Sequence, residues 1–331
     1  MDWFKRLTGF QEGGYAETQR RLRVSGQRLT SLVNGRHYDI GRLQLPSLAE
    51  LRLQGADVRV PGQLRVQSLA ADARQLHSDP DHEGAVFQVA SQFNLLEMVG
   101  PQVTPEDGVT GYESDLTQGP ACAMAAGAAT IYRNYLAPVG GGVGQTADRQ
   151  INALADLERA LAGKLASRRS PWVMSNGYAL ASQESLREIN AVLDDEAEAE
   201  ELKGLLRVGA HWGVEVTDRE LPGQKVSQVF CSAMPVAYSG APAKDWTLLG
   251  RLVLEAAYEA TLWAALLNAQ GGGSNKVLLT RLGGGVFGNL DGWIDAALLG
   301  ALEKFEDQGL EVTLVRKPPP PREELLSPWS P

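Results

Sequence analysis

Residues 248–305 place the strongest constraint on how this chain folds. Six apolar residues recur there at spacings of four and three, and form one stripe along a helix: Leu249, Val253, Ala256, Ala260, Trp263 and Leu267. A short apolar run at 277–279 has strand character, three consecutive glycines follow it, and residues 293–305 show a second helical pattern. A buried helix, a short strand and another helix in this order predict an α/β fold built in layers.

The same alternation runs through most of the chain. Strands are predicted at 63–66, 85–90, 214–217, 226–236 and 310–315, and helices at 120–132, 148–166 and 182–209. Strands alternating with helices over this length predict a three-layer α/β/α sandwich around a mixed central sheet. In such sheets ligands bind beyond the carboxyl ends of the strands, which is where the glycine-rich segment 283–288 lies.

We divide the chain into three parts. Residues 1–61 are predicted to be a small β-rich N-terminal extension, because Asn34-Gly35 between two strand-like runs favours a hairpin. Residues 62–317 form the predicted α/β/α domain, with a helical insert around 137–224. Lys317 and the four prolines after it end the pattern, so residues 318–331 are predicted to be a Pro-rich disordered tail.

Composition and charge limit the functional classes. Among the 331 residues 44% are hydrophobic, yet no apolar stretch is long enough to span a bilayer, and the first residues lack the apolar core of a secretory signal. Two cysteines cannot form a disulfide framework, so we expect a cytoplasmic, reducing setting. The net charge of −9 argues against a nucleic-acid platform; any such contact is expected only through the basic extension, where ten Lys and Arg outnumber six Asp and Glu.

The glycine-rich segment after the strand at 277–279 has two interpretations. Glycines can simply supply the positive φ angles of a loose strand-to-helix connection. They can also let backbone N–H groups converge on an anion, with the following helix N-terminus adding a favourable dipole. The segment alone leaves both interpretations open.

Three stretches together resemble the macrodomain family of ADP-ribose-binding α/β/α modules. Residues 64–76, LRVQSLAADARQL, are similar to its early strand and Gly-Asp-Ile-Thr turn. Residues 85–94, AVFQVASQFN, are similar to the buried strand that ends in Asn-Ala-Ala-Asn. Residues 278–289, LLTRLGGGVFGN, are similar to the second phosphate loop, with Phe287 at the family's aromatic position.

The resemblance implies that the chain binds ADP-ribose or a related nucleotide diphosphate. It implies that Asp72 holds adenine, that Asn94 lies beside the distal ribose, and that the glycine loop wraps the diphosphate. The implied ligand-binding residues are Asp72, Ala73, Asn94, Gly283, Gly284, Gly285, Val286, Phe287, Gly288 and Asn289. No cofactor is implied.

An acidic segment, 95–120, replaces the family's first glycine-rich loop. Its carboxylates are Glu97, Glu106, Asp107, Glu113 and Asp115, just before the helix that starts near Pro120. Carboxylates there can cap the helix, or they can stabilise the oxocarbenium-like state in which a bond to ribose breaks. The poly(ADP-ribose) glycohydrolase branch of the family resembles this chain in having acidic residues at that place. We assign catalytic roles to Asn94, Glu113 and Asp115, and helix capping remains the alternative for the two carboxylates.

Other chemistries find less support. The cluster His77, Asp79, Asp81, His82 and Glu83 is irregularly spaced and has no cysteine nearby, so we predict a polar turn and no metal site. No P-loop lysine follows a glycine pair, which argues against hydrolysis of nucleoside triphosphates. The sequence therefore predicts an ADP-ribosyl glycohydrolase-type hydrolase. The alternatives are a non-catalytic ADP-ribose reader and an interaction scaffold on the same fold.

Overall fold

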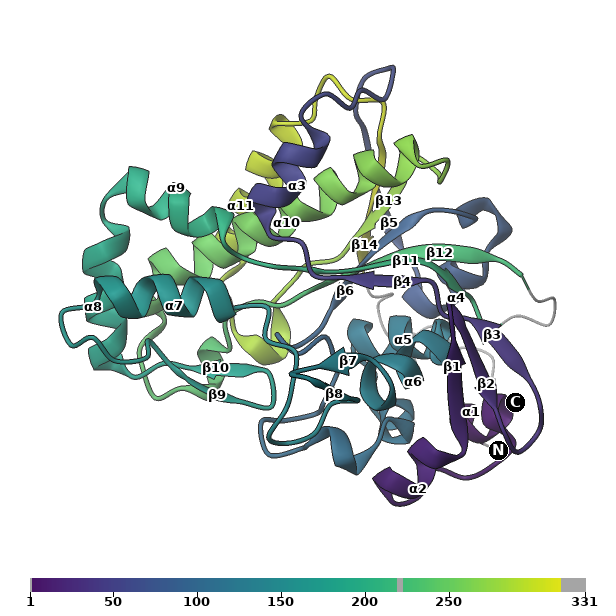
Figure 1. Ribbon diagram of the computed structural model, residues 1–331. Coiled ribbons are helices and arrows are strands. Elements are labelled where there is room, and N and C mark those ends of the chain that lie inside the picture. The colour runs from purple at the N-terminus through teal and green to yellow at the C-terminus, as the bar shows by residue number, and fades with distance from the viewer. Residues whose placement is uncertain (1, 219–222, 317–331) are drawn as a thin grey trace, which may run out of the picture.

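A seven-stranded mixed sheet forms the centre of the protein in the computed structural model, which describes residues 2–218 and 223–316 (Figure 1). Its strand order is β4 (Arg42–Gln44), β11 (Gly209–Glu215), β12 (Lys225–Cys231), β6 (Val86–Ala90), β13 (Lys276–Leu279), β14 (Glu311–Arg316) and β5 (Arg65–Ala70). The strands from β12 to β5 are parallel, and β4 and β11 are antiparallel to their neighbours. The predicted α/β/α fold with a mixed central sheet is confirmed.

Helices cover both faces of this sheet (Figure 1). One layer contains α3 (Leu48–Gly55), α10 (Thr247–Gln270) and α11 (Asp291–Glu303), and the other contains α4 (Ala73–Ser78), α5 (Gln118–Ala125) and α6 (Gly127–Tyr135). The side chains of β6 alternate between them. Val86 joins the core of the first layer, whereas Phe87 and Val89 join the clusters of the second. A strand buried on both faces explains the continuous apolar run that predicted it.

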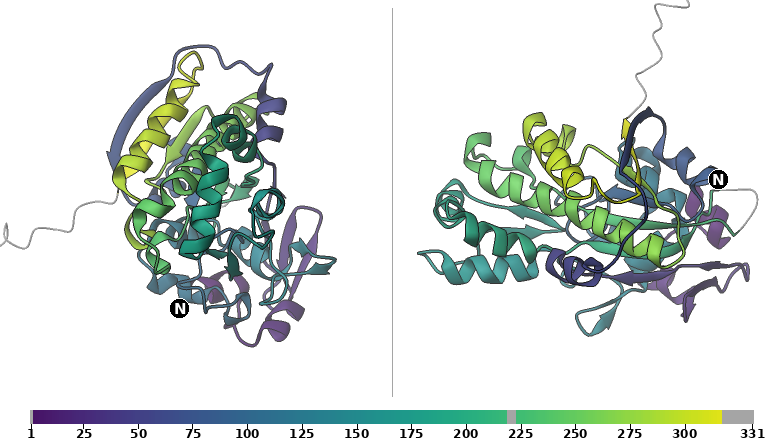
Figure 2. Two further views of the ribbon diagram at one scale, coloured as in Figure 1. Left: turned by 90° about the vertical axis from the view of Figure 1, so that its left-hand side faces the viewer. Right: turned by 90° about the horizontal axis from the view of Figure 1, so that it is seen from above.

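Residues 137–208 begin with a short hairpin beside α6, and the helices after it extend the α10 layer beyond the end of the sheet (Figures 1 and 2). They contain β7 (Pro138–Val139), β8 (Gly142–Val143), α7 (Ala155–Lys164), β9 (Val173–Ser175), β10 (Tyr178–Leu180), α8 (Gln183–Leu193) and α9 (Glu196–Gly204). The helices α8 and α9 pack against α10, and β9 pairs with β10 as a hairpin. The predicted insert does not reach residue 224 as a separate unit, because β11 pairs with both β4 and β12 in the central sheet.

The N-terminal residues lie against the α6 side of the protein. They form α1 (Trp3–Thr8), α2 (Tyr15–Arg20) and a small antiparallel sheet of β1 (Leu22–Ser25), β2 (Arg28–Ser31) and β3 (His37–Asp39). Trp3 and Phe4 are buried with residues of α6 in one apolar cluster. The predicted boundary at residue 61 does not separate two sheets, because β4 forms an edge of the central one.

Short 3₁₀ turns complete the described chain: η1 (Pro80–His82), η2 (Pro105–Asp107), η3 (Thr110–Ser114), η4 (Val236–Tyr238), η5 (Ala243–Trp246) and η6 (Gly285–Phe287). Within residues 2–218 and 223–316, none of the helices combines the length and the apolar character needed to cross a membrane. The predicted tail, 318–331, lies outside the described residues.

Candidate active site

The loops that follow β6, β12 and β13 enclose a cavity of about 160 Å³ together with the start of α5. These three strands are parallel neighbours, so their carboxyl ends meet at one edge of the sheet. The lining residues are Ala90, Ser91, Gln92, Glu97, Met98, Asp115, Thr117, Gln118, Gly119, Pro120, Ala233, Thr280, Arg281, Leu282, Gly283, Gly284, Val286 and Phe287. The predicted glycine loop therefore forms one wall of a cavity.

Backbone donors of the glycine loop are available to a ligand. Gly283, Gly285 and Gly288 have φ angles of +74°, +63° and +72°, a region that glycine adopts without strain. Across the part of the chain that the structure describes, no group accepts a hydrogen bond from the N–H of Gly283 or Gly284. Two unpaired N–H groups beside a cavity favour the anion-cradle interpretation over a loose connection.

Asn289 fixes the shape of this loop from behind. Its side-chain Nδ2 donates to the carbonyl oxygens of Met234 at 2.8 Å and Gly283 at 3.1 Å, and its backbone N–H also donates to Gly283. A side chain on Gly283 would approach within 2.4 Å of Ala233 Cβ. The side chain of Asn289 therefore stabilises the glycine loop and links that loop to the segment after β12.

Phe287 is part of an aromatic cluster at the cavity. Its ring lies 5.4 Å from that of Tyr178 on β10 and 5.7 Å from that of Tyr238. The hydroxyl of Tyr178 donates to the carbonyl oxygen of Met98 at 2.9 Å. The β9–β10 hairpin thus connects two walls of the cavity, the loop after β6 and the loop after β13.

Glu97 is the most unusual group in the cavity. The residue is only 3% exposed, and neither oxygen of its carboxylate has a hydrogen-bond partner among the described residues. Burial raises the pKa of Glu97 to about 8, although the charge of Arg133 and the neighbouring hydroxyl of Tyr112 oppose this shift. A buried, unpartnered carboxyl group that ionises near neutral pH has the properties of a general acid or base.

Gly119 makes room for the carboxyl group of Glu97. A Cβ atom at position 119 would lie 3.0 Å from Glu97 Cγ and 2.1 Å from the carbonyl oxygen of Ala90. Gln118 holds the start of α5 in this position, since its side chain accepts from the N–H of Ala90 and donates to the carbonyl of Gln88. The first turn of α5 therefore packs directly on the end of β6 with Glu97 beside it.

Asp115 lines the same cavity and also supports the local backbone. Its Oδ1 accepts a hydrogen bond from the N–H of Thr117 at 2.8 Å, just before the first turn of α5. The side chain is partly exposed, and its charge contributes to the raised pKa of Glu97. The cavity is therefore lined by two carboxyl groups, that of Glu97, which is buried, and that of Asp115, which lies at the rim.

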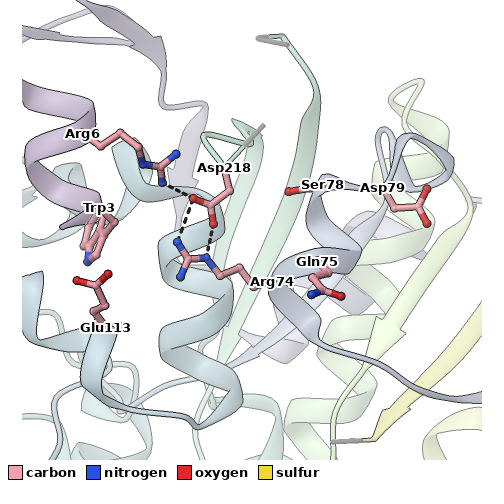
Figure 3. A pocket seen from close by; sticks show the side chains of 8 residues that line it. All are labelled: Trp3, Arg6, Arg74, Gln75, Ser78, Asp79, Glu113 and Asp218. Atoms are coloured by element: carbon pink, nitrogen blue, oxygen red, sulfur yellow. Dashed lines mark hydrogen bonds and ion pairs between the residues drawn. The ribbon is translucent and has the colours of Figure 1, made fainter. Parts of the chain in front are cut away.

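Glu113 does not reach this cavity. It is exposed and lines a separate open cavity of about 630 Å³ between α1, α4 and Asp218 (Figure 3). Arg6 and Arg74 both pair with Asp218 there, and the carboxylate of Glu113 lies beside the ring of Trp3 (Figure 3). Asp115 lines the cavity of the glycine loop and Glu113 does not, because Glu113 lies within η3 whereas Asp115 follows its last residue, where the backbone becomes extended.

The structure also places Asn94, Asp72 and Ala73 away from the cavity lining. Asn94 is fully buried; its Nδ2 donates to Gln150 Oε1 at 2.9 Å and its Oδ1 accepts from the N–H of Leu96. Asp72 is the N-cap of α4, and Ala73 is buried in an apolar cluster. These three residues stabilise the local structure. None of them lines the cavity, so the contacts with ligand that the resemblance implied for them are not found there.

Glu97 was not among the predicted catalytic residues, although it belongs to the acidic segment 95–120 that supplied two of them. The sequence feature that points to Glu97 is its apolar surroundings. Its neighbours along the chain are Leu95, Leu96 and Met98, and all three are buried. A carboxylate within an apolar run is expected to be buried and to have a shifted pKa.

No family model matches the chain, and no curated protein sequence matches it. Among solved structures, a mutant poly(ADP-ribose) glycohydrolase from Deinococcus radiodurans in complex with ADP-ribose matches with 12% identity and a TM-score of 0.43, over 95% of this chain and 94% of that one. The poly(ADP-ribose) glycohydrolase from Thermomonospora curvata bound to the inhibitor ADP-HPD matches with 14% identity and a TM-score of 0.39, over 92% and 91%.

Proposed function

We propose that this protein binds ADP-ribose or a related nucleotide diphosphate and hydrolyses an ADP-ribosyl linkage, with Glu97 as the acid–base residue. The observation that carries this proposal is that one cavity is lined both by the buried carboxyl group of Glu97, whose oxygens have no hydrogen-bond partner, and by the unpaired N–H groups of Gly283 and Gly284. The first is suited to breaking a bond to ribose, and the second to holding a phosphate. The resemblance of 278–289 to a macrodomain phosphate loop supports the same ligand.

The chemistry requires one proton transfer in each direction. The bond between the ribose anomeric carbon and its leaving oxygen or nitrogen breaks, and Glu97 donates a proton to the leaving atom. Water then adds to the anomeric carbon and gives up a proton to the Glu97 carboxylate, which restores the acid. With a pKa of about 8, most Glu97 carries a proton at pH 7 and can act as the acid. Asp115 supplies the second carboxylate, which stabilises the positive charge that develops on the sugar.

The size of the cavity limits how much of such a ligand is enclosed. Its volume of about 160 Å³ is below the roughly 300–1,000 Å³ of pockets that bury a whole drug-sized ligand. We infer that the reacting ribose and the adjoining phosphate enter it, and that the rest of the nucleotide lies on the open face.

Substitution of the two carboxylates tests the catalytic part of the proposal. Glu97→Gln is expected to lower the turnover of an ADP-ribosylated substrate by about 10²-fold or more, because an acid–base group contributes about 10²–10⁴-fold to rate. Asp115→Asn is expected to reduce turnover as well. The affinity for free ADP-ribose, measured by calorimetric titration, should change by less than about tenfold in both variants.

Glu113→Gln is the matched control, because it removes a carboxylate two residues from Asp115 that lies outside the cavity. It should keep both activity and affinity. Equal loss of activity in the Glu97 and Glu113 variants would contradict the assignment of the site. Binding of ADP-ribose with no hydrolysis of protein or nucleic-acid conjugates by the unmodified protein would instead leave the non-catalytic reader.

A further inference from the structure

Arg133 is a buried cation next to the cavity that the proposed chemistry has not yet used. It lies on α6 and is fully buried. Its Nε donates to the carbonyl oxygen of Leu95 at 3.1 Å, and its Nη2 donates to Thr130 Oγ1 at 3.1 Å. The guanidinium carbon also lies 3.8 Å from the centre of the Phe230 ring, an arrangement that stabilises a cation. The guanidinium is therefore held in one place by groups on three elements.

The carboxyl group of Glu97 lies directly beside this fixed charge. Nη2 of Arg133 is 3.8 Å from Oε1 of Glu97, which is too long for a hydrogen bond and short enough for strong attraction at a buried site. A close bidentate pair would occupy the carboxylate oxygens and hold them away from a substrate. At the observed distance Arg133 attracts the carboxylate, and both of its oxygens remain without a hydrogen-bond partner.

Other polar groups act on the same carboxyl group. Tyr112 on η3 faces it and accepts a hydrogen bond from the N–H of Glu97 at 3.0 Å, and Asp115 adds a like charge from the rim. Cys122 on α5 is buried, and burial, followed by the charge of Glu97, raises the pKa of its thiol well above the usual value. On the other side of Arg133, burial and the guanidinium lower the pKa of His211 well below its ordinary value, so His211 adds no second cation.

We propose that Arg133 is a positioning residue for Glu97, whose fixed charge orients the carboxyl group at the cavity and sets the pH at which it ionises. This inference rests on the proposed function for its purpose. Burial raises the free-energy cost of ionising Glu97, and the charge of Arg133 lowers that cost. The two effects together allow Glu97 to gain and lose a proton although it is buried. Arg133 stays charged over the whole accessible pH range.

The test measures the ionisation of Glu97 directly and needs no ligand. Infrared difference spectra between each protein and its version carrying Glu97→Gln follow the protonated carboxyl band of Glu97 from pH 5 to pH 10. In Arg133→Gln the midpoint is expected to rise by about one unit or more, since a neighbouring opposite charge typically lowers a carboxyl pKa by one to three units. Arg133→Lys, which keeps a charge on the same stem, should shift the midpoint by less than half as much.

Arg52→Gln is the control, because Arg52 also pairs with a buried carboxylate, Glu259, in the opposite helix layer. It should leave the midpoint of Glu97 unchanged. A midpoint in Arg133→Gln within about 0.3 units of the unmodified protein overturns the proposal, as does an equal shift in Arg133→Lys. If Arg133→Gln does not fold, Arg133→Met takes its place. Failure of Arg133→Lys to fold would assign Arg133 to packing and would also overturn the proposal.

The proposed function has a separate readout. If ADP-ribose neither binds nor is hydrolysed while the infrared midpoint shifts as expected, the proposed function fails and the role of Arg133 stands. If hydrolysis occurs, its pH profile should move to higher pH in Arg133→Gln along with the infrared midpoint.

Discussion

Gly284 differs from the glycines on either side of it in the cavity wall. Its φ of −68° is open to any residue, and a Cβ atom there would meet nothing closer than Ile294 Cδ1 at 3.6 Å. Gly283 has a positive φ and no space for a side chain. A substitution at position 284 therefore changes the cavity without straining the loop, and it separates ligand binding from folding.

We expect Gly284→Glu to abolish ADP-ribose binding while the protein stays folded. The new carboxylate would stand beside the N–H groups that are proposed to hold phosphate, and it would repel the diphosphate. Calorimetric titration with ADP-ribose measures the binding, and the urea midpoint measures stability. Gly292→Glu adds the same charge at an exposed position nearby that has no neighbour within 4 Å, and it should bind normally. Unchanged affinity in Gly284→Glu would exclude the phosphate cradle.

At the scale of elements, α10 is joined to its two neighbouring helices by one buried carboxylate. Glu259 on α10 accepts hydrogen bonds from Arg52 on α3 at 2.5 and 2.9 Å and is paired with Lys304 just after α11. Burial raises the pKa of Glu259, but the hydrogen bonds from Arg52 and Lys304 outweigh it and lower the pKa to about 2. This ion triad connects the three helices that form one layer.

Glu259→Gln is expected to reduce the free energy of unfolding at pH 7 by about 2–3 kcal/mol, since it removes the counter-charge of Lys304 and leaves Arg52 paired with Glu200 alone. Because the pKa is lower in the folded state than in the unfolded chain, the stabilisation is present above about pH 4.5 and is lost as pH falls toward 2. Urea unfolding at pH 7, 4 and 3 should therefore show a difference between the proteins that shrinks with pH. Glu255→Gln, at a partly exposed pair, should cost less than about 1 kcal/mol. A constant difference would contradict the ionic explanation.

For the molecule as a whole, the sequence predicted the layers well because periodic patterns report burial. The stripe from Leu249 to Leu267 lies within α10, and the apolar run at 85–90 is β6. The candidate site was predicted only in part. The glycine loop lies at the cavity because it follows an apolar strand directly in the sequence. Asn94 lies outside the cavity lining, and its side chain is hydrogen-bonded to Gln150 and to the N–H of Leu96. Which of the five carboxylates reaches the cavity depends on the turn at η3 and on the space over Gly119, and neither is written in residue spacing.

The N-terminal 61 residues are expected to be required for folding. They supply β4 at the edge of the central sheet, Arg52 for the ion triad, and the buried side chains of Trp3 and Phe4 against α6. A protein that starts at residue 62 would expose the edge of β11 and the apolar surface of α6, and it would leave Glu259 with Lys304 alone. We therefore expect the fragment 62–331 to be insoluble, or to lack a cooperative unfolding transition and ADP-ribose binding.

Thermal unfolding and calorimetric titration of the fragment, compared with the full chain, provide the measurement. Addition of a separately produced peptide of residues 1–61 should restore part of the transition, because the lost contacts are non-covalent. A fragment that is soluble on its own, unfolds cooperatively within a few degrees of the full chain and binds ADP-ribose equally well would show the reverse: the extension would then be a separate unit packed on a complete domain, and the boundary at residue 61 would be a domain boundary after all.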